Sequence, residues 1–328
     1  MNLHDRILEL TQEHSGYGHN GILFSFSLDM CRKIDEASAN DSFAEKTVKD
    51  ILKLLKDYQV GYSEKLKSAF EVYSEYAIFH EIRSKGIPIE RVPEGKEARP
   101  DFKISRGGED LYLEAKVLGW ASGGIQHNAA INDGIDAQIS IEDQIKDGKN
   151  VAFGESEISP LGTTKESIEN PDKYFIEAIS AKLNQNVKSA QLKLGPTFLI
   201  CDLTSLHHPS DYRKSSVIVH NDNIYDSYSS GELWHIAFGE HGDRILKAIE
   251  FEGKPNVSGK LQRNGVLIEY EELIGVIFRV SNLSGVCSYS CLIKAKHFDK
   301  YGDLIIHLSD CWNDDNNSNA WELLSRGS

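Results

Sequence analysis

Two short segments of alternating apolar residues flank a Gly-Gly pair, Gly107-Gly108, in the first third of the chain. The segments, Asp101–Ser105 and Tyr112–Leu118, have the two-residue period of β-strands. A Gly-Gly pair between two such segments is typical of a two-residue hairpin turn. We therefore expect an antiparallel hairpin here, and its register is set by the turn.

The predicted register gives the hairpin one polar face and one apolar face. Asp101 lies directly opposite Glu114, and Lys116 follows on the same face. Two carboxylates a few Å apart repel each other unless a cation lies between them, and two oxygens with water are a common way to hold Mg²⁺. The simpler alternative is a hairpin whose charged face is solvated. The apolar face collects Phe102, Ile104, Leu113, Ala115 and Val117.

Pro100-Asp101 followed by Glu114-Ala115-Lys116 resembles the motif of the PD-(D/E)xK nuclease superfamily. The resemblance implies an α/β fold with a restriction-endonuclease-like αβββαβ core around a central mixed sheet. It also implies Mg²⁺-dependent phosphodiester hydrolysis, with Mn²⁺ able to substitute. Asp101, Glu114 and the carbonyl of Ala115 would be the metal ligands. Lys116 would position or polarise the attacking water and stabilise the charge that develops on the phosphate.

A long helix is expected from Ser63 to Lys85, because Gly86 is a natural residue after a helix C-terminus. The superfamily pattern has a helix glutamate before the Pro-Asp strand, and Glu75 is the residue that fits. Glu75 lies within an apolar arc of this helix, where a carboxylate is costly unless it meets a cation or a donor. The alternative is a glutamate at the rim of the helix. Glu81 is expected to form a surface ion pair with Lys85, four residues on.

A second helix is expected from Pro171 to about Lys193, followed by a strand at Thr197–Leu203. Related nucleases often have a Lys or Gln on this helix, near the phosphate or the attacking water. Lys182 and Gln185 are preferred for this role, because Lys182 borders the buried stripe and Gln185 lies a turn further on. The other candidates are Lys188 and Gln191, and a solvated helix face is the alternative for the whole set.

The chain is expected to divide into three parts. Residues 1–60 form an N-terminal helical segment, and residues 61–205 form the nuclease-like core with an inserted stretch at about 119–170. Residues 206–328 form a mixed α/β extension packed on this core. The inserted stretch contains an expected helix at Asp136–Lys146. In the last part, strands are expected at Leu233–Phe238, Leu273–Val280, Ser288–Ile293 and Leu304–Leu308.

The net charge of −14 argues against a protein that coats nucleic acid, because phosphate binding draws on clustered Lys and Arg. Residues 83–106 nevertheless carry seven basic and four acidic side chains, a local excess around the candidate site. Nucleic acid is therefore an admissible partner, with DNA favoured over RNA and a role in restriction or phage defence implied by the resemblance. A solvated loop of mixed charge explains the excess equally well.

A cytoplasmic protein with free thiols is expected, because the five cysteines include no CxxC pair and the chain has no run of eighteen apolar residues. No membrane association is expected, whereas a homodimer or a protein partner stays open. The competing function is a non-catalytic binding module that retains the nuclease fold. The intact Asp101, Glu114 and Lys116 set argues against this alternative.

Overall fold

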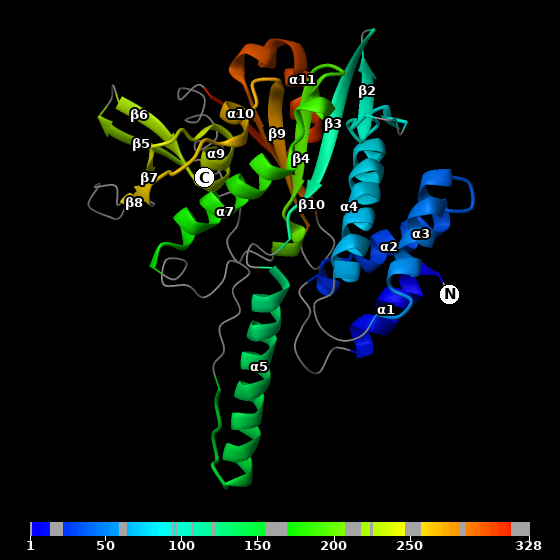
Figure 1. Ribbon diagram of the computed structural model, residues 1–328, viewed down its shortest axis with the longest axis vertical. Coiled ribbons are helices and arrows are strands. Elements are labelled where there is room, and N and C mark those ends of the chain that lie inside the picture. Colours follow the sequence, from blue (N-terminus) through cyan, green and yellow to red (C-terminus); the bar gives the residue numbers. More distant parts are fainter. Residues whose placement is uncertain are drawn as a thin grey trace.

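The protein is an α/β structure in which helices cover both faces of a seven-stranded mixed sheet (Figure 1). The computed structural model describes residues 2–13, 22–58, 64–93, 95, 97–106, 108–119, 123–154, 169–206, 218–223, 226–246, 257–281 and 287–315. The strand order is β1-β2-β3-β4-β9-β10-β11. The strands are β1 (Ile89–Arg91), β2 (Phe102–Arg106), β3 (Glu109–Val117), β4 (Thr197–Asp202), β9 (Leu273–Ser281), β10 (Cys287–Ile293) and β11 (Cys311–Asp314).

In the described part of the chain, four α-helices precede the sheet, and the other α-helices are distributed between its strands. The first four are α1 (Leu3–Glu13), α2 (Leu28–Ala37), α3 (Ser42–Leu54) and α4 (Glu64–Ser84). The later ones are α5 (Gly123–Lys146), α7 (Pro171–Asn186), α9 (Glu232–Phe238), α10 (Val266–Glu269) and α11 (Phe298–Leu308). Two small hairpins lie outside the sheet: β5 (Ile218–Asn223) with β6 (Asp226–Ser230), and β7 (Arg244–Leu246) with β8 (Val257–Lys260). Among the described residues, no helix has the length and apolar character needed to cross a membrane.

The β2–β3 hairpin has the register that the sequence predicts. Phe102 pairs with Leu113, and the pairing continues to Arg106 and Glu109, which leaves two residues for the connection. Gly108 has a φ of +84°, which L residues with a side chain rarely adopt. Gly107 lies outside the described residues. The Gly-Gly pair thus correctly indicated where the strands reverse.

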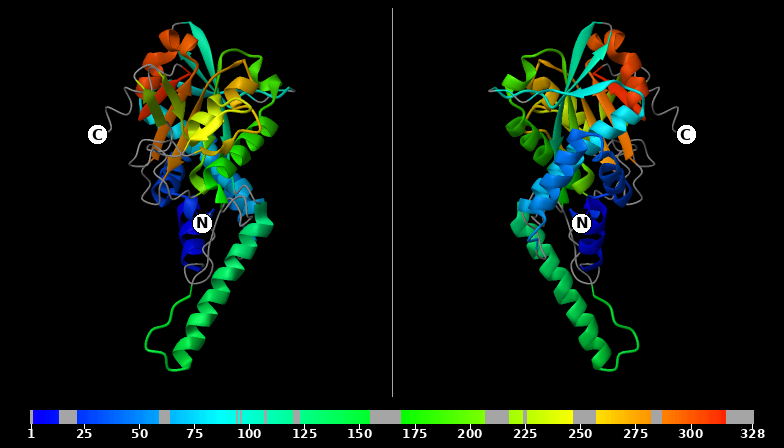
Figure 2. Two further views of the ribbon diagram at one scale, coloured as in Figure 1. Left: turned by 90° about the vertical axis from the view of Figure 1, so that its left-hand side faces the viewer. Right: turned by 90° about the vertical axis from the view of Figure 1, so that its right-hand side faces the viewer.

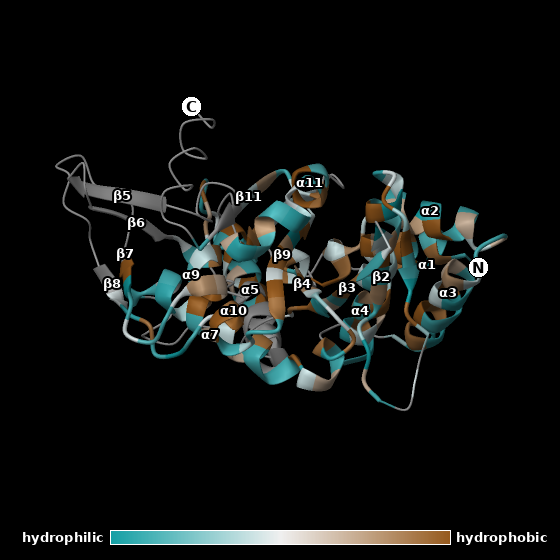
Figure 3. Cartoon of the chain, turned by 90° about the horizontal axis from the view of Figure 1, so that it is seen from above, coloured by the Kyte–Doolittle hydropathy of each residue, from teal (hydrophilic) through white to brown (hydrophobic). Residues whose placement is uncertain are grey.

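The sheet separates two hydrophobic cores, as expected for a sheet covered on both faces. In β4, Phe198 and Ile200 belong to the core beneath α1–α4 and α11, whereas Leu199 and Cys201 belong to the core beneath α7, α9 and α10. Figure 3 shows the sheet in section between these two sets of helices. The strand alternation therefore places neighbouring side chains of β3 in contact with different helical layers.

Helix α4 positions the first functional side chains. It occupies almost the expected range and ends before Gly86, whose φ of +78° is the left-handed conformation of a helix C-terminus. Helix α5 behaves differently, because it projects away from the rest of the molecule (Figures 1 and 2). It begins at Gly123, well before the expected Asp136, and connects to the chain just beyond β3.

Several expectations from the sequence are corrected by the structure. Residues 233–238 and 304–308, expected as strands, lie in helices α9 and α11. Short apolar runs fit a buried strand or a buried helix equally well, so periodicity alone could not separate them. The last third also supplies β9–β11 to the main sheet. All five cysteines are free thiols, as predicted.

Candidate active site

Asp101 lies in a bend immediately before β2, at the point where the β2–β3 ladder ends. Its Oδ2 accepts a hydrogen bond of 2.8 Å from the backbone N–H of Ala115. In a strand, the N–H and C=O of one residue point to the same side, so the Ala115 carbonyl also faces the side of Asp101. The Asp101 carboxylate and the Ala115 carbonyl are thus brought to one edge of β3.

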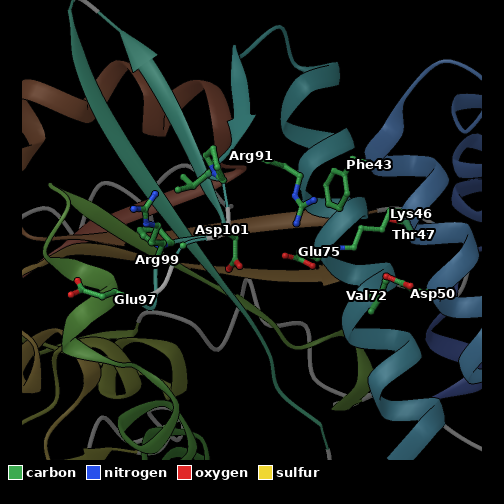
Figure 4. Close-up of a pocket in the computed structure, with 14 residues that line it drawn as sticks. Phe43, Lys46, Thr47, Asp50, Val72, Glu75, Arg91, Glu97, Arg99 and Asp101 are labelled. Carbon is green, nitrogen blue, oxygen red and sulfur yellow. The ribbon is translucent and has the colours of Figure 1, made fainter.

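Glu75 on α4 reaches the same place from the helical layer. Its side chain forms a hydrogen bond with Asp101, and Figure 4 shows the two carboxyl groups directed toward each other. Burial and the charge of Asp101 raise the pKa of Glu75 to about 7. The pKa of Asp101 is also raised, mainly by burial. We call Glu75 and Asp101 the acid pair.

Glu114 lies on β3 and is only 1% exposed. Its Oε1 accepts hydrogen bonds from Lys116 Nζ and from Gln191 Nε2, each at 2.5 Å. Its Oε2 is buried and has no hydrogen-bond partner among the described residues. Burial and the charge of Asp101 raise the pKa of Glu114 to about 7. Glu114 therefore interacts electrostatically with the acid pair, but its carboxylate is held by Lys116 and Gln191.

A cavity of about 700 Å³, which we call the central cavity, opens beside these residues. Lys182 and Gln185, the two residues preferred from the sequence, both line it, and so does Lys188, another of the candidates. Lys182 Nζ donates a 2.8 Å hydrogen bond to the Gly119 carbonyl, and burial together with the charge of Lys67 lowers the pKa of Lys182 to about 8. The remaining lining residues include Lys67, Ser68, Glu71, Val72, Glu75, Asp101, Ala115, Lys116, Val117, Leu118 and Asn186.

Gln191 is the residue that sequence reasoning ranked too low. Helix α7 ends at Asn186, short of the expected Lys193, and Gln191 lies in the following 3-10 turn, Ser189–Leu192. Its Oε1 accepts from Lys188 N at 3.2 Å while its amide N–H donates to Glu114. The sequence carried no signal for this role. With the predicted helix end at Lys193, seven residues too late, Gln191 was expected on the side of a regular helix.

The expectation for Glu81 was wrong. It does not form a surface pair with Lys85, because the Arg279 guanidinium binds both of its oxygens, at 2.7 and 2.9 Å. Arg279 also donates to Asp202 Oδ2 at 2.6 Å, and Asp202 accepts from the Ser74 hydroxyl. This buried network joins α4 to β4 and β9, and it fixes the helix that carries Glu75.

The donor set fits a hard divalent cation. Among the described residues, no group of three or more His, Cys, Asp or Glu side chains has the geometry of a metal site. A cation would therefore depend on Asp101, Glu114, the Ala115 carbonyl and water, and Mg²⁺ commonly keeps several waters and only one or two carboxylates. Glu114 Oε2 has no hydrogen-bond partner among the described residues, and burial is the main cause that raises the pKa of Glu75, Asp101 and Glu114. A cation at this point would favour the charged forms of these carboxyl groups.

Comparisons of the chain with protein-family models, with curated proteins and with solved structures return no match.

Proposed function

We propose that this protein is a metal-dependent nuclease that hydrolyses phosphodiester bonds, with DNA as the favoured substrate. The chain order of α4, β1–β3, α7 and β4 supports an αβββαβ core of the restriction-endonuclease type, interrupted by α5. The observation that carries the proposal is the convergence of Glu75, Asp101 and Lys116 on one cavity, with buried Glu114 hydrogen-bonded to Lys116. These residues come from helix α4, the bend before β2, and strand β3.

Asp101, Glu114 and the Ala115 carbonyl would hold the cation, and Glu75 would add a further carboxyl group beside it through its hydrogen bond to Asp101. A bound Mg²⁺ supplies positive charge next to the phosphate and lowers the pKa of water. Lys116 positions the attacking water and offsets the negative charge that develops on the phosphate. Its partner is Glu114 Oε1, from which Nζ is 2.5 Å away, and this contact leaves Glu114 Oε2 for a cation.

Lys182 and Gln185 contact the phosphate from the other wall of the central cavity. The cavity is lined by four lysines, Lys67, Lys116, Lys182 and Lys188, in a chain whose net charge is −14. Electrostatic attraction to phosphate depends on the charge near the binding site. These four lysines therefore provide a surface that can bind phosphate, although the net charge of the chain is negative.

The experiment is a cleavage assay on supercoiled plasmid, linear duplex and single-stranded DNA, with Mg²⁺, Mn²⁺, Ca²⁺ or EDTA. Mg²⁺ and Mn²⁺ should support cleavage, and EDTA should stop it. Asp101→Asn should lower the rate by at least two orders of magnitude, because it removes charge from the cation site. Asp110→Asn is the matched control. Asp110 lies on the same hairpin, but its carboxylate accepts a hydrogen bond from Ser105, and it does not line the central cavity.

Cleavage that persists unchanged in Asp101→Asn would come from a contaminant or from a different site, and would contradict the proposal. If the wild-type protein binds DNA but cleaves no substrate with any of these cations, the non-catalytic binding module becomes the better account. RNA tested in parallel decides the choice of polymer.

A further inference from the structure

A second cavity, of about 420 Å³, adjoins the central cavity at the acid pair. We call it the β1 cavity. It shares Val72, Glu75 and Asp101 with the central cavity, so the acid pair separates two adjoining hollows. A polymer whose scissile bond lies at the acid pair would extend into both of them.

Arg91, the last residue of β1, is the main cation next to the acid pair on this side. Its backbone is fixed beside Asp101, because Arg91 pairs with Phe102 and the next residue, Val92, donates its N–H to the Asp101 carbonyl at 2.9 Å. Figure 4 shows its guanidinium beside the Phe43 ring and directed toward the Glu75 carboxyl group. The guanidinium carbon is 4.1 Å from the Phe43 ring centroid. This stacking holds the planar group in one orientation before any ligand binds.

The Arg91 guanidinium has unused binding capacity. Its Nε is buried and has no hydrogen-bond partner among the described residues. A buried N–H without an acceptor is rare in native proteins and indicates a missing water, ion or ligand. Because an arginine donates through a planar fork, the ligand that suits it best is a carboxylate or a phosphate.

Two further cations, Lys46 and Arg99, line the β1 cavity. Arg99 lies so close to Gly95 that a Cβ at this glycine would be 2.5 Å from Arg99 Nε, so the glycine keeps room for the guanidinium. Four carboxyl groups also line the cavity and outnumber its three cations: Asp50, Glu75, Glu97 and Asp101. The cavity therefore favours an anion only when a divalent cation neutralises the acid pair, and Arg91 is the cation held beside that pair.

We infer that the β1 cavity is a second phosphate subsite, in which Arg91 binds the DNA backbone phosphate next to the scissile one. This inference rests on the proposed function for the identity of the polymer. It assigns the two cavities to the two sides of the cleaved bond, and it makes Arg91 a substrate-binding residue rather than a partner of the acid pair alone.

The test is fluorescence anisotropy with a labelled single-stranded DNA of twelve nucleotides, in Ca²⁺, at several salt concentrations. Arg91→Ala should weaken binding about 10-fold or more, because a charge-assisted hydrogen bond is lost. The slope of log affinity against log salt should become shallower by about 0.7, the value for one phosphate contact on a single strand. Arg91→Lys should restore the slope but only part of the affinity, since the planar fork is missing.

Arg83→Ala is the matched control. Arg83 also lies over a phenylalanine, with its guanidinium carbon 5.8 Å from the Phe79 ring centroid, but it lines neither cavity. It should leave both affinity and salt slope unchanged. A circular dichroism melt of each variant shows that the protein is folded.

Equal affinity and equal slope in wild type and Arg91→Ala would overturn the inference, and so would a wild-type protein that does not bind the oligonucleotide. A variant that binds normally but cleaves slowly would also overturn it, because Arg91 would then act on the acid pair. If wild type shows the Arg91-dependent binding but cleaves nothing in Mg²⁺ or Mn²⁺, the subsite stands and the nuclease proposal fails.

Discussion

Arg279→Leu should lower the free energy of unfolding by about 3–5 kcal/mol. Arg279 is 1% exposed, and its guanidinium donates to both oxygens of Glu81 and to Asp202, with bonds of 2.6–2.9 Å. Leucine would fill much of the space but would leave two largely buried carboxylates without their shared cation. The magnitude follows from this uncompensated charge and not from lost packing, because removing one member of a buried ion pair is far costlier than replacing the whole set.

The assay is urea unfolding at pH 7, with Arg263→Leu as the control. Arg263 binds Glu177 at 2.9 Å, a distance like those of Arg279, but its side chain is 43% exposed. An exposed ion pair contributes 0–1 kcal/mol at the median, so the control should change stability by about 1 kcal/mol or less. Equal effects of the two substitutions would refute the reasoning that burial decides the cost.

The pH dependence supplies a second check with a defined sign. Burial tends to raise the pKa of Glu81, but the charge and hydrogen bonds of Arg279 outweigh it and lower the pKa below 4.5. Wild-type Glu81 therefore contributes stability above its unfolded pKa, and this contribution is lost as pH falls through the folded pKa. In Arg279→Leu the hydrogen bonds of Tyr289 and Cys287 to Glu81 remain, but the charge and hydrogen bonds of Arg279 that oppose burial are gone, so the pKa of Glu81 should be higher than in wild type. The stability that ionised Glu81 contributes above its unfolded pKa should therefore be smaller in the variant, and the two proteins should differ less in stability at low pH than at pH 7.

Three other predictions concern single contacts. Gln191→Leu should lower the free energy of unfolding, measured in urea, by about 1–3 kcal/mol, because buried Glu114 loses a hydrogen-bond donor. Gln144→Leu on exposed α5 is the control and should lower it by about 0.5 kcal/mol or less. Oligonucleotide affinity should fall as pH rises through about 8, where half-buried Lys182 loses its charge. The same titration of Lys182→Arg should show no such fall. In thermal unfolding, Gly108→Ala should lower the free energy of unfolding by about 1 kcal/mol, because alanine is strained at the φ of +84° that Gly108 has. Gly119→Ala should leave it unchanged, because there is room for a Cβ at that position.

The local parts of the fold and site were predictable from the sequence. The Gly-Gly pair and the alternation around it determine the β2–β3 register, and the apolar arc of α4 placed Glu75 rather than Glu81 next to Asp101. The register depends on residues of one hairpin and the apolar arc on residues of one helix, where strand and helix periods are reliable guides.

The remaining features depend on contacts that are distant in the chain. Glu81 had an apparent partner four residues away, but its actual partner, Arg279, lies 198 residues away on β9. Gln191 reaches Glu114 only because α7 ends early and a 3-10 turn follows. Residues 304–308 are an apolar run whose helical form is decided by packing of α11 against the sheet. Sequence periodicity carries none of this information.

The most direct measurement compares cation binding and chemistry in Lys116→Ala. Titration calorimetry with Mn²⁺ should give an affinity equal to or higher than that of wild type, because the substitution releases Glu114 Oε1 from its 2.5 Å contact with Lys116 Nζ. Single-turnover cleavage of the same DNA should be slower by at least two orders of magnitude, because the group that positions the water and offsets phosphate charge is gone. An unchanged cleavage rate in Lys116→Ala would show that the lysine is an ordinary surface residue and would contradict the proposed site.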